Sequence, residues 1–355
     1  MPYKISTLSA GKGQTLALLE SGEVLGWGGA GSGRYLPESV DICSPLNVNQ
    51  GPVYVGQSDR FSSVSAGYGV SLGISERQVL MIWGFSPLGY GDSQMISEIP
   101  SVIEQVTAPV RVAAGQSCFA AITQSGALYT WGLNIDGVLG RHSAEINALP
   151  GMVTDLPPVE EVGLGDHFMI VLSRQGEVFS FGSNSAGQLG LGHLETKEAP
   201  VRVKLPNSVH RLAVGSTHVL TLDKEGSLWG WGSNHFGQLG NSLSRYSEIP
   251  VLIKTPEKIT AIAAGCHFSL ALSVTGHVYA WGWNGFGQLG LNDGAPRTTP
   301  ARIAGLSEVR AIAAGEMYAT AIGKSDLFGW GNNDSGQIGQ AAQKQLVPYP
   351  FWSLG

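Results

Sequence analysis

Three landmarks recur in fixed order along this chain, and they constrain its fold more than any other feature. The first is a small residue followed by glycine, leading into an apolar stretch, as in SAGKGQTLAL and AAGCHFSLAL. Its glycines are Gly11, Gly67, Gly115, Gly165, Gly215, Gly265 and Gly315, with spacings of 56, 48, 50, 50, 50 and 50 residues. A constant period of this length indicates a repeat architecture.

The other two landmarks follow at nearly constant distances. The second is an aromatic residue followed by glycine, and this glycine lies 17 residues after the first glycine in six copies and 16 in the last. Its members are Trp27-Gly28, Trp83-Gly84, Trp131-Gly132, Phe181-Gly182, Trp231-Gly232, Trp281-Gly282 and Trp330-Gly331. The third reads GVLG at 137–140, GQLG at 187–190, 237–240 and 287–290, and GQIG at 336–339. Seven structural repeats are therefore predicted.

The pattern within one repeat is that of short β-strands. Segments such as KITAIAAG, FSLALSV and HVYAWGW are rich in β-branched and aromatic residues, and turn residues separate them. A further extended piece follows Pro200, Pro250 and Pro300. About four strands per repeat and no helix predict an all-β protein, a seven-bladed β-propeller that fills residues 1–355 as a single domain.

Two packing expectations follow from a closed ring of blades. The seven aromatic rings of the second landmark should pack between neighbouring blades, each burying about 150–250 Å². An open ring would expose unpaired strand edges, so closure needs a device. The tail LVPYPFWS (346–353) reads as the strand that follows a proline, and the head YKISTLSAG as the strand that should come next. We expect these N- and C-terminal strands to pair in one shared blade.

Composition and charge exclude several function classes. The net charge is −6, the isoelectric point is about 5.7, and no Lys/Arg block occurs, which argues against nucleic-acid binding. The three cysteines form no C-x-x-C pair, as is typical of a reducing compartment. No apolar run approaches the roughly 20 residues of a membrane span. We therefore expect a cytoplasmic protein, without membrane insertion, that binds other proteins.

The segment 285–290, GFGQLG, matches the G-x-G-x-x-G pattern of a dinucleotide-binding loop. That loop lies between a strand and a helix, with the helix N-terminus facing the pyrophosphate. Here LNDGAPRTTP follows, which cannot begin a helix, and the sister copies SAGQLG, HFGQLG and DSGQIG lack the first glycine. We interpret these glycines as structural.

No enzyme motif stands out in the sequence. His167, His218 and His267 follow the first landmark in three different repeats, in non-identical registers. Metal ligation would require side chains of different blades to converge, so hydrogen-bonded structural histidines are the favoured interpretation. We find no Ser/His/Asp set, carboxylate pair or zinc motif, and expect a non-enzymatic protein with no cofactor and no metal.

The positions that vary within the constant frame are the candidates for function. Between the second and third landmarks the loops read LNID, SNSA, SNHF, WNGF and NNDS, and they should project from one face of the disc. The side chain of the recurring asparagine is expected to form the turn by contacting its own backbone. The remaining candidates for a partner-binding surface are His235, Phe236, Trp283, Phe286 and Asp334. Exposed aromatics anchor protein partners; alternatively, Phe236 and Phe286 cover the adjacent blade.

These repeats closely resemble those of the regulator of chromosome condensation family, a seven-bladed propeller, over essentially the whole chain. Repeats one and two match least, because residues 31–34 and 87–90 stand where GQLG is expected. The founding member is the exchange factor for the small GTPase Ran, and it opens the nucleotide site with one disc face and a wedge on its third repeat. The resemblance therefore implies a GTPase partner and exchange without covalent chemistry.

The segment that corresponds to the family's wedge is WGLNIDGVLGRHSAEINALP (131–150), the one copy with GVLG. The GTPase-contact candidates that the resemblance implies are Asn134, Ile135, Asp136, Val138, Arg141 and His142, with Asp166 and His167 on the same side. The chain departs from the family pattern because, after the first glycines, only Asp166 and Glu316 are acidic, and because the basic N-terminal tail is absent. Partner binding is thus better supported than exchange, and chromatin binding is not supported.

Two other functions stay open at this point. One is a rigid, monomeric scaffold that docks proteins without acting on a GTPase. The other resembles the plant UV-B photoreceptor, whose clustered tryptophans lie two residues after the blade aromatic. Only Trp283 matches that position, since Ser183, Ser233 and Asn333 or a neighbour stand in the other repeats, and the GWRHT stretch is missing. A bacterial source would make the chain an effector delivered into a host cell.

Overall fold

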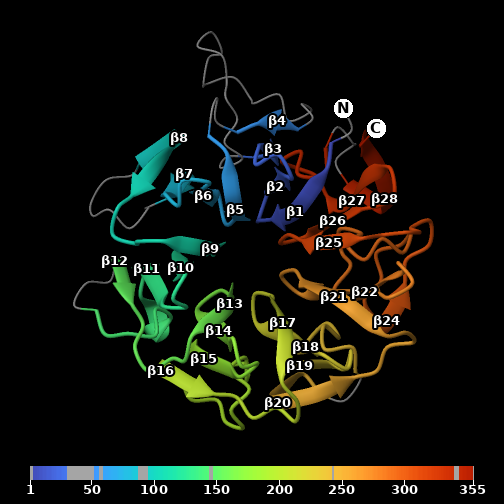
Figure 1. Ribbon diagram of the computed structural model, residues 1–355. Coiled ribbons are helices and arrows are strands. Elements are labelled where there is room, and N and C mark those ends of the chain that lie inside the picture. The colour runs from blue at the N-terminus through green and yellow to red at the C-terminus, as the bar shows by residue number, and fades with distance from the viewer. Residues whose placement is uncertain are drawn as a thin grey trace.

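The computed structural model describes residues 3–29, 52–55, 59–86, 95–143, 147–241, 244–339 and 344–354. These residues form seven four-stranded antiparallel sheets arranged radially around one axis (Figure 1). The seven-bladed propeller predicted from the repeats is confirmed. Among the described residues no helix has the length and apolar character needed to cross a bilayer.

Each of the first four blades is built from four consecutive strands, innermost strand first. Blade one holds β1 (Ile5–Ala10), β2 (Gln14–Leu19), β3 (Val24–Gly28) and β4 (Val53–Tyr54). Blade two holds β5 (Phe61–Ala66), β6 (Val70–Ser75), β7 (Leu80–Ser86) and β8 (Met95–Ile103). Blade three holds β9 (Pro109–Ala114), β10 (Cys118–Thr123), β11 (Leu128–Leu133), the short 3-10 helix η1 (Ile135–Gly137) and β12 (Asn147–Met152). Blade four holds β13 (Val159–Leu164), β14 (Phe168–Ser173), β15 (Val178–Gly182) and β16 (Lys197–Arg202).

The last three blades repeat this plan. Blade five holds β17 (Val209–Val214), β18 (His218–Asp223), β19 (Leu228–Ser233) and β20 (Tyr246–Ile253). Blade six holds β21 (Ile259–Ala264), β22 (Phe268–Ser273), β23 (Val278–Gly282) and β24 (Arg297–Arg302). Blade seven holds β25 (Ala311–Ala314), β26 (Tyr318–Ile322), β27 (Asp326–Asn332) and β28 (Lys344–Ser353).

The outermost strands begin earlier than the prolines suggested. Pro200, Pro250 and Pro300 lie inside β16, β20 and β24, which start three or four residues before them. A proline is tolerated there because the outermost strand of a blade is an edge strand. In β16 and β24 the pairing register also shifts close to the proline.

The core lies between the blades, and the expected packing of the landmark aromatics there is confirmed. Trp231 of blade five is fully buried in a cluster with Phe168 and Leu189 of blade four. The other six landmark aromatics occupy the equivalent place in their own clusters, where each packs against residues of the preceding blade. Every junction between blades therefore has one large ring at its centre.

The glycines of the landmarks are required by close approaches in the backbone. Gly282, after the blade aromatic Trp281, has a φ of +103°, and a Cβ there would lie 2.5 Å from the carbonyl oxygen of His267. A Cβ on Gly265 would lie 2.6 Å from the carbonyl oxygen of Gly315 in the next blade. A side chain fits neither position, so these repeats retain glycine.

The predicted pairing of the two terminal strands in one blade is wrong. The N-terminal strand β1 pairs with β2 in blade one, and the C-terminal strand β28 pairs with β27 in blade seven. The reason is the connectivity of the ring: the strand that follows an outermost strand is the innermost strand of the next blade. The termini still touch, because Tyr3 N donates to Leu354 O at 2.9 Å.

A ring of backbone hydrogen bonds around the axis closes the disc. The amide after each first-landmark glycine donates to a carbonyl of the following blade in six of the seven junctions. The bonds are Lys12 N to Gly67 O, Tyr68 N to Gly115 O, Asp166 N to Ser216 O, Ser216 N to Cys266 O, Cys266 N to Glu316 O and Glu316 N to Gly11 O, all between 3.0 and 3.3 Å. The last of them joins blade seven to blade one as the others join their neighbours.

Candidate functional site

One face of the disc carries both the first-landmark turns and the long loops, and we call it the glycine face. The turn between the first two strands of a blade contacts the loop after the third strand, as in Ser183 N to His167 O at 2.8 Å and Trp283 N to His267 O at 2.9 Å. The variable positions picked from the sequence therefore belong to the same face as Asp166 and His167. This agrees with the expectation that the loops share one side.

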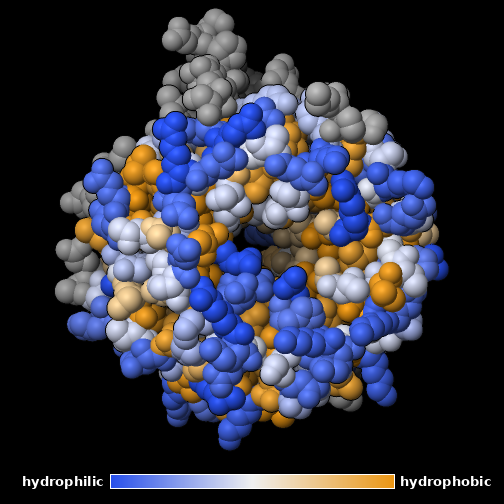
Figure 2. All heavy atoms as spheres, in the orientation of Figure 1, coloured by the Kyte–Doolittle hydropathy of each residue, from blue (hydrophilic) through white to orange (hydrophobic). Residues whose placement is uncertain are grey.

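The centre of the disc is hollow, as the space-filling view shows (Figure 2). At the glycine face this hollow is a cavity of about 460 Å³, bordered by the residues that follow the first-landmark glycines. Those residues are Lys12, Tyr68, Gln116, Asp166, Ser216, Cys266 and Glu316. They differ in charge and size from blade to blade, while the small residues before them keep the channel open.

The charges at this cavity come from two half-buried carboxylates and one lysine. Burial raises the pKa of Asp166, while the Ser216 side chain opposes this shift. Burial likewise raises the pKa of Glu316, against the effect of Lys12. Lys12 Nζ lies 3.7 Å from Glu316 Oε2 and 3.6 Å from the ring centre of Tyr68. The cavity is therefore polar, with a fixed ion pair on one side and Asp166 on the other.

Cys266 at this cavity is not a reactive thiol. It is free, and burial raises its pKa to about 11, whereas a reactive cysteine has a lowered pKa. Ser216 Oγ donates to its Sγ at 3.2 Å. Cys118 is also free and fully buried, and the third cysteine, Cys43, lies outside the described residues.

The third-blade loop does not form a protruding wedge in its described part. Val138 is 1% exposed and packs in the core with Leu139, so its prediction as a partner contact is wrong. Arg141 turns back onto its own blade, where its guanidinium donates to the carbonyls of Thr130 at 2.9 Å and Leu149 at 2.6 Å. Burial also lowers the pKa of Arg141. These two side chains hold the loop and are not offered to a partner.

The same loop leaves a smaller exposed set. Asn134 is used for the turn, because its Oδ1 accepts from Leu139 N at 3.1 Å, as Asn184 does from Leu189 N and Asn234 from Leu239 N. The turn-forming role predicted for this asparagine is thus confirmed, while a partner contact of half-buried Asn134 stays a prediction. Ile135, Asp136 and His142 are exposed on this blade, and Ile135 is accessible over 39% of its surface.

A chain of aromatic rings crosses the loops of blades five and six, and we call Phe236, His267, Trp283 and Phe286 the aromatic band. Ring centres lie 5.3 Å apart for Phe236 and His267, 5.9 Å for Phe236 and Trp283, and 5.6 Å for Trp283 and Phe286. Phe236 covers the adjacent blade and still exposes 39% of its surface. Both interpretations therefore hold at once for Phe236, whereas Phe286 packs on Trp283 of its own blade. The role of these rings in partner binding stays a prediction.

The structure gathers some of the predicted residues and separates others. Exposed His235 lies beside Phe236 in the band's loop, while Asp334 is exposed on blade seven. His167 follows Asp166 at the channel and is half-buried. Blade four separates the exposed residues of blade three from the aromatic band. The exposed candidates thus form two separate groups on one face, with Asp334 apart from both. Asp166 and the adjacent His167 belong to neither group and lie at the channel.

The G-x-G-x-x-G segment of residues 285–290 lies in the loop between β23 and β24, with no helix in it. Asn284 Oδ1 accepts from Leu289 N at 2.9 Å, as in the sister loops, and Gln288 O accepts from the indole of Trp330 at 2.9 Å. Gly287 and Gly290 have φ of +78° and +67°, which L side chains rarely adopt, so the interpretation of these glycines as structural is confirmed.

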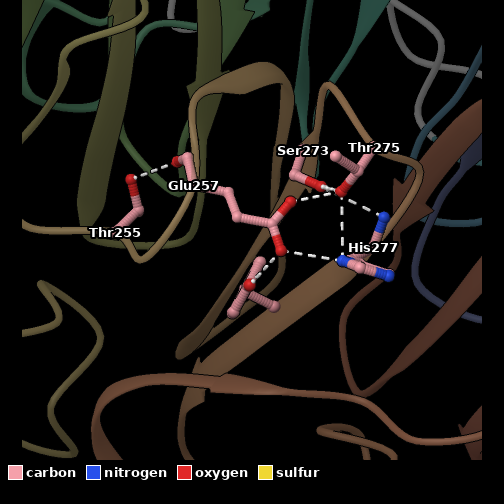
Figure 3. Close-up of polar contacts among 6 residues, drawn as sticks. Thr255, Glu257, Ser273, Thr275 and His277 are labelled. Atoms are coloured by element: carbon pink, nitrogen blue, oxygen red, sulfur yellow. Dashed lines mark hydrogen bonds and ion pairs between the residues drawn. The ribbon is translucent and has the colours of Figure 1, made fainter.

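On the opposite face a hydroxyl, a histidine and a carboxylate meet, an arrangement that the sequence did not suggest (Figure 3). Glu257 precedes β21, and its carboxylate accepts from Thr275, from His277 Nδ1 at 2.7 Å and from Tyr279 at 2.8 Å. These hydrogen bonds lower the pKa of Glu257 to about 2. The histidine uses the same Nδ1 toward Thr275 Oγ1, at 3.0 Å, and toward Glu257.

That geometry does not activate a nucleophile. In a catalytic triad the two ring nitrogens act in opposite directions, one toward the hydroxyl and one toward the acid. Here both partners share Nδ1, and Ser273 Oγ binds the turn by accepting from His277 N at 3.1 Å. The cluster is a clamp between the segment before β21 and the turn after β22. Spacing in sequence could not reveal it, because Glu257 lies some 20 residues from its partners.

A radial all-β disc of four-stranded blades with variable loops on one face defines the class of the β-propellers. The family model of the RCC1-like domain matches residues 85–352 of the chain. The chain therefore belongs to the RCC1-like domain family, as the repeats suggested.

Curated relatives match over part of the chain. The human RCC1-like G exchanging factor-like protein is 30% identical over 136 residues, which cover 35% of this chain and 28% of that protein. The human E3 ubiquitin-protein ligase HERC2 is 30% identical over 140 residues, or 38% of this chain and 3% of the ligase. The Arabidopsis ultraviolet-B receptor UVR8 is 32% identical over 146 residues, or 39% of this chain and 32% of the receptor. The matches thus span less than a third of each relative.

Solved structures agree with the fold over nearly the whole chain. Human WBSCR16 superposes with a TM-score of 0.81 at 22% identity, covering 93% of this chain and 94% of that one. Prp20p from Saccharomyces cerevisiae, described with its binding to Gsp1p and histones, gives 0.79 at 21% identity, covering 89% and 82%. At this identity the likeness establishes the fold.

Proposed function

We propose that this protein is a binding propeller that engages a small GTPase of the Ran class through its glycine face and promotes nucleotide release. The observation that carries the proposal is the aromatic band, an apolar and partly exposed surface beside a polar channel on one face. Exposed aromatics of this kind anchor protein partners. Family membership supports a GTPase as that partner, since a human relative is named as G exchanging factor-like and a yeast propeller as binding Gsp1p.

The proposed activity requires no covalent step on this chain. A propeller face promotes release by binding the nucleotide-free GTPase more tightly than the loaded one, because a ligand shifts a conformational equilibrium only by its differential affinity. The side chains available for this are the aromatic band, exposed Ile135, Asp136 and His142, and the channel carboxylate of Asp166. We place this action in the cytoplasm, or in the cytoplasm of a host cell if the source is bacterial.

A scaffold that binds proteins without exchange is the second candidate. The inward position of Val138 and Arg141 favours it, because the segment expected to act as a wedge is folded onto its own blade. The photoreceptor alternative gains no support from the ring contacts. In the described part of the chain, Trp283 contacts Phe236, His267 and Phe286, and no ring pair joins two tryptophans.

Nucleotide release separates the first two candidates. Ran and related GTPases are loaded with a fluorescent nucleotide, and its release is followed with and without the propeller. Accelerated release that Asp136→Ala weakens supports exchange. Binding of a GTPase without acceleration supports the scaffold, and neither binding nor acceleration with any small GTPase contradicts the proposal.

A further inference from the structure

A second cavity lies on the glycine face beside the aromatic band, over blade five and between the loops of blades four and six. It has a volume of about 570 Å³ and is lined by Ala186, Thr217, Ser233, His235, Phe236, Arg245 and His267. Its lining contains no carboxylate, although the chain as a whole carries a net charge of −6. We call it the side pocket.

The polar groups of the side pocket are mostly hydrogen-bond donors. Arg245 is exposed, and the ion pairs among the described residues do not include it. Its backbone is fixed, because its carbonyl accepts from Asn234 N at 2.7 Å. Ser233 Oγ accepts from Gln238 Nε2 at 3.1 Å, which leaves its own proton to donate. A guanidinium, two hydroxyls and two imidazoles with no acid among them suit an anionic group.

Asp166, whose charge acts on the side pocket, does not serve as the counter-ion of Arg245. Asp166 interacts with His267 through charge, but its carboxylate lines the central channel. Asp166 is not part of the side-pocket lining. Arg245 therefore has no intramolecular counter-ion within the described residues, and an external anion can take that place.

The wall of the side pocket indicates what carries the anion. Phe236 forms part of the lining, and the aromatic band continues from it across Trp283 to Phe286 at ring distances of 5.9 and 5.6 Å. Such a surface extends beyond the pocket and suits a chain segment with an apolar or aromatic residue next to an acidic one. A small oxyanion would use the donors and leave the band uncovered.

We propose that the side pocket and the aromatic band together bind an acidic segment of a partner protein, with a Glu or Asp side chain at Arg245 and a neighbouring aromatic or apolar side chain on Phe236 and Trp283. The inference goes beyond the proposed function, because it names the chemistry of the bound segment and holds whether or not the partner is a GTPase. Its test accordingly contains no GTPase.

The test measures fluorescence anisotropy of labelled short peptides in which Glu residues flank one Trp at several spacings. The matched probe replaces every Glu by Gln. We expect at least one Glu peptide to bind roughly tenfold more tightly than its Gln counterpart, as a charge-assisted hydrogen bond predicts. Arg245→Gln should remove this difference, so that both peptides bind alike. Added salt should weaken the Glu peptide selectively.

The control is Arg77→Gln, since Arg77 is an exposed arginine in the turn between β6 and β7 on the opposite face. It should leave the preference for Glu unchanged, and melting curves check that each variant is folded. Absence of peptide binding, equal binding of Glu and Gln peptides, or an equal loss in both arginine variants overturns the proposal. Displacement of the peptide by inorganic phosphate at low millimolar concentration overturns it in favour of a small oxyanion.

Discussion

Trp27 in blade one donates its indole Nε1–H to the carbonyl oxygen of Gln337 in blade seven, at 2.9 Å. The same bond joins Trp231 to Gln188, Trp281 to Gln238 and Trp330 to Gln288, at 2.8 to 2.9 Å. The third landmark of one repeat thus accepts a hydrogen bond from the second landmark of the next. The junction that closes the ring is built like the three junctions between blades four and seven.

These bonds predict unequal costs for the substitution of tryptophan by phenylalanine. Gln337 O also accepts from Thr15 Oγ1 at 3.0 Å, so Trp27→Phe leaves it with a partner, and we expect a loss of about 1 kcal/mol. Gln188 O has no second side-chain donor among the described residues, so Trp231→Phe should cost about 1–3 kcal/mol. Urea unfolding of both variants measures the difference, and equal costs would argue against this role.

Removal of residues 346–355 should destabilise the whole ring. It deletes most of β28, including Phe351, whose ring lies 5.6 Å from Trp27, and Leu354, whose carbonyl accepts from Tyr3. We expect one cooperative unfolding transition at a clearly lower temperature. Val347→Ala, at an exposed position of the same strand, should change little. An unchanged melting curve of the truncated chain would contradict this contribution of β28 to ring closure.

His218 should make the fold sensitive to mild acid. It is fully buried, which lowers its pKa to about 3, and its Nε2 lies 3.0 Å from Ser269 Oγ. Below the ordinary value of 6.5 the unfolded chain binds a proton that the folded chain does not. Stability should therefore fall with decreasing pH between 6.5 and about 3, by up to about 1.4 kcal/mol per pH unit.

His218→Phe should remove that dependence, because Phe168 and Phe268 occupy the equivalent position in blades four and six. The check is urea unfolding of both proteins at about pH 7 and about pH 5. The variant should lose less stability on acidification than the natural chain. Identical losses would show that the folded state accommodates the imidazolium.

Glu257 should act in a different pH range. Its folded pKa of about 2 lies below the ordinary 4.5. Its contribution to the stability of the fold is therefore present above pH 4.5 and is lost as the pH falls from there toward 2. Glu257→Gln should lower the melting temperature above pH 4.5 and flatten its acid dependence. Glu225→Gln, at an exposed position in the turn of blade five that corresponds to the Thr275 turn, serves as control. If the melting temperature of Glu257→Gln depends on pH as that of the natural chain does, the stabilising role of Glu257 is contradicted.

The repeat alone predicted the blade count, the strand content and the buried aromatics, because these depend on spacing and residue type. It did not predict how the ring closes, since which strand pairs with which end is a matter of connectivity. Val138 and Arg141 looked like surface residues because they depart from the repeat, yet a departure can also be absorbed by packing, as their inward positions show.

The clamp at Glu257 and the side pocket at Arg245 were missed for a common reason. Each is assembled from segments of different strands or blades, and no local pattern marks them. What the sequence did indicate was the face: the loop positions that vary within the frame, above all Phe236 and Trp283, lie where the aromatic band is exposed. Candidate residues could be predicted there, but not their division into two groups.

The most direct test of the proposed function is the affinity of nucleotide-free Ran, or the related GTPase found by the release assay, for three forms of the propeller. The double variant Phe236→Ala, Trp283→Ala removes the band, and Tyr349→Ala removes an exposed ring of β28. Removal of the band should weaken binding by about tenfold or more. Tyr349→Ala and the natural chain should bind the GTPase with equal affinity. Equal affinities of all three folded forms would contradict binding through the glycine face.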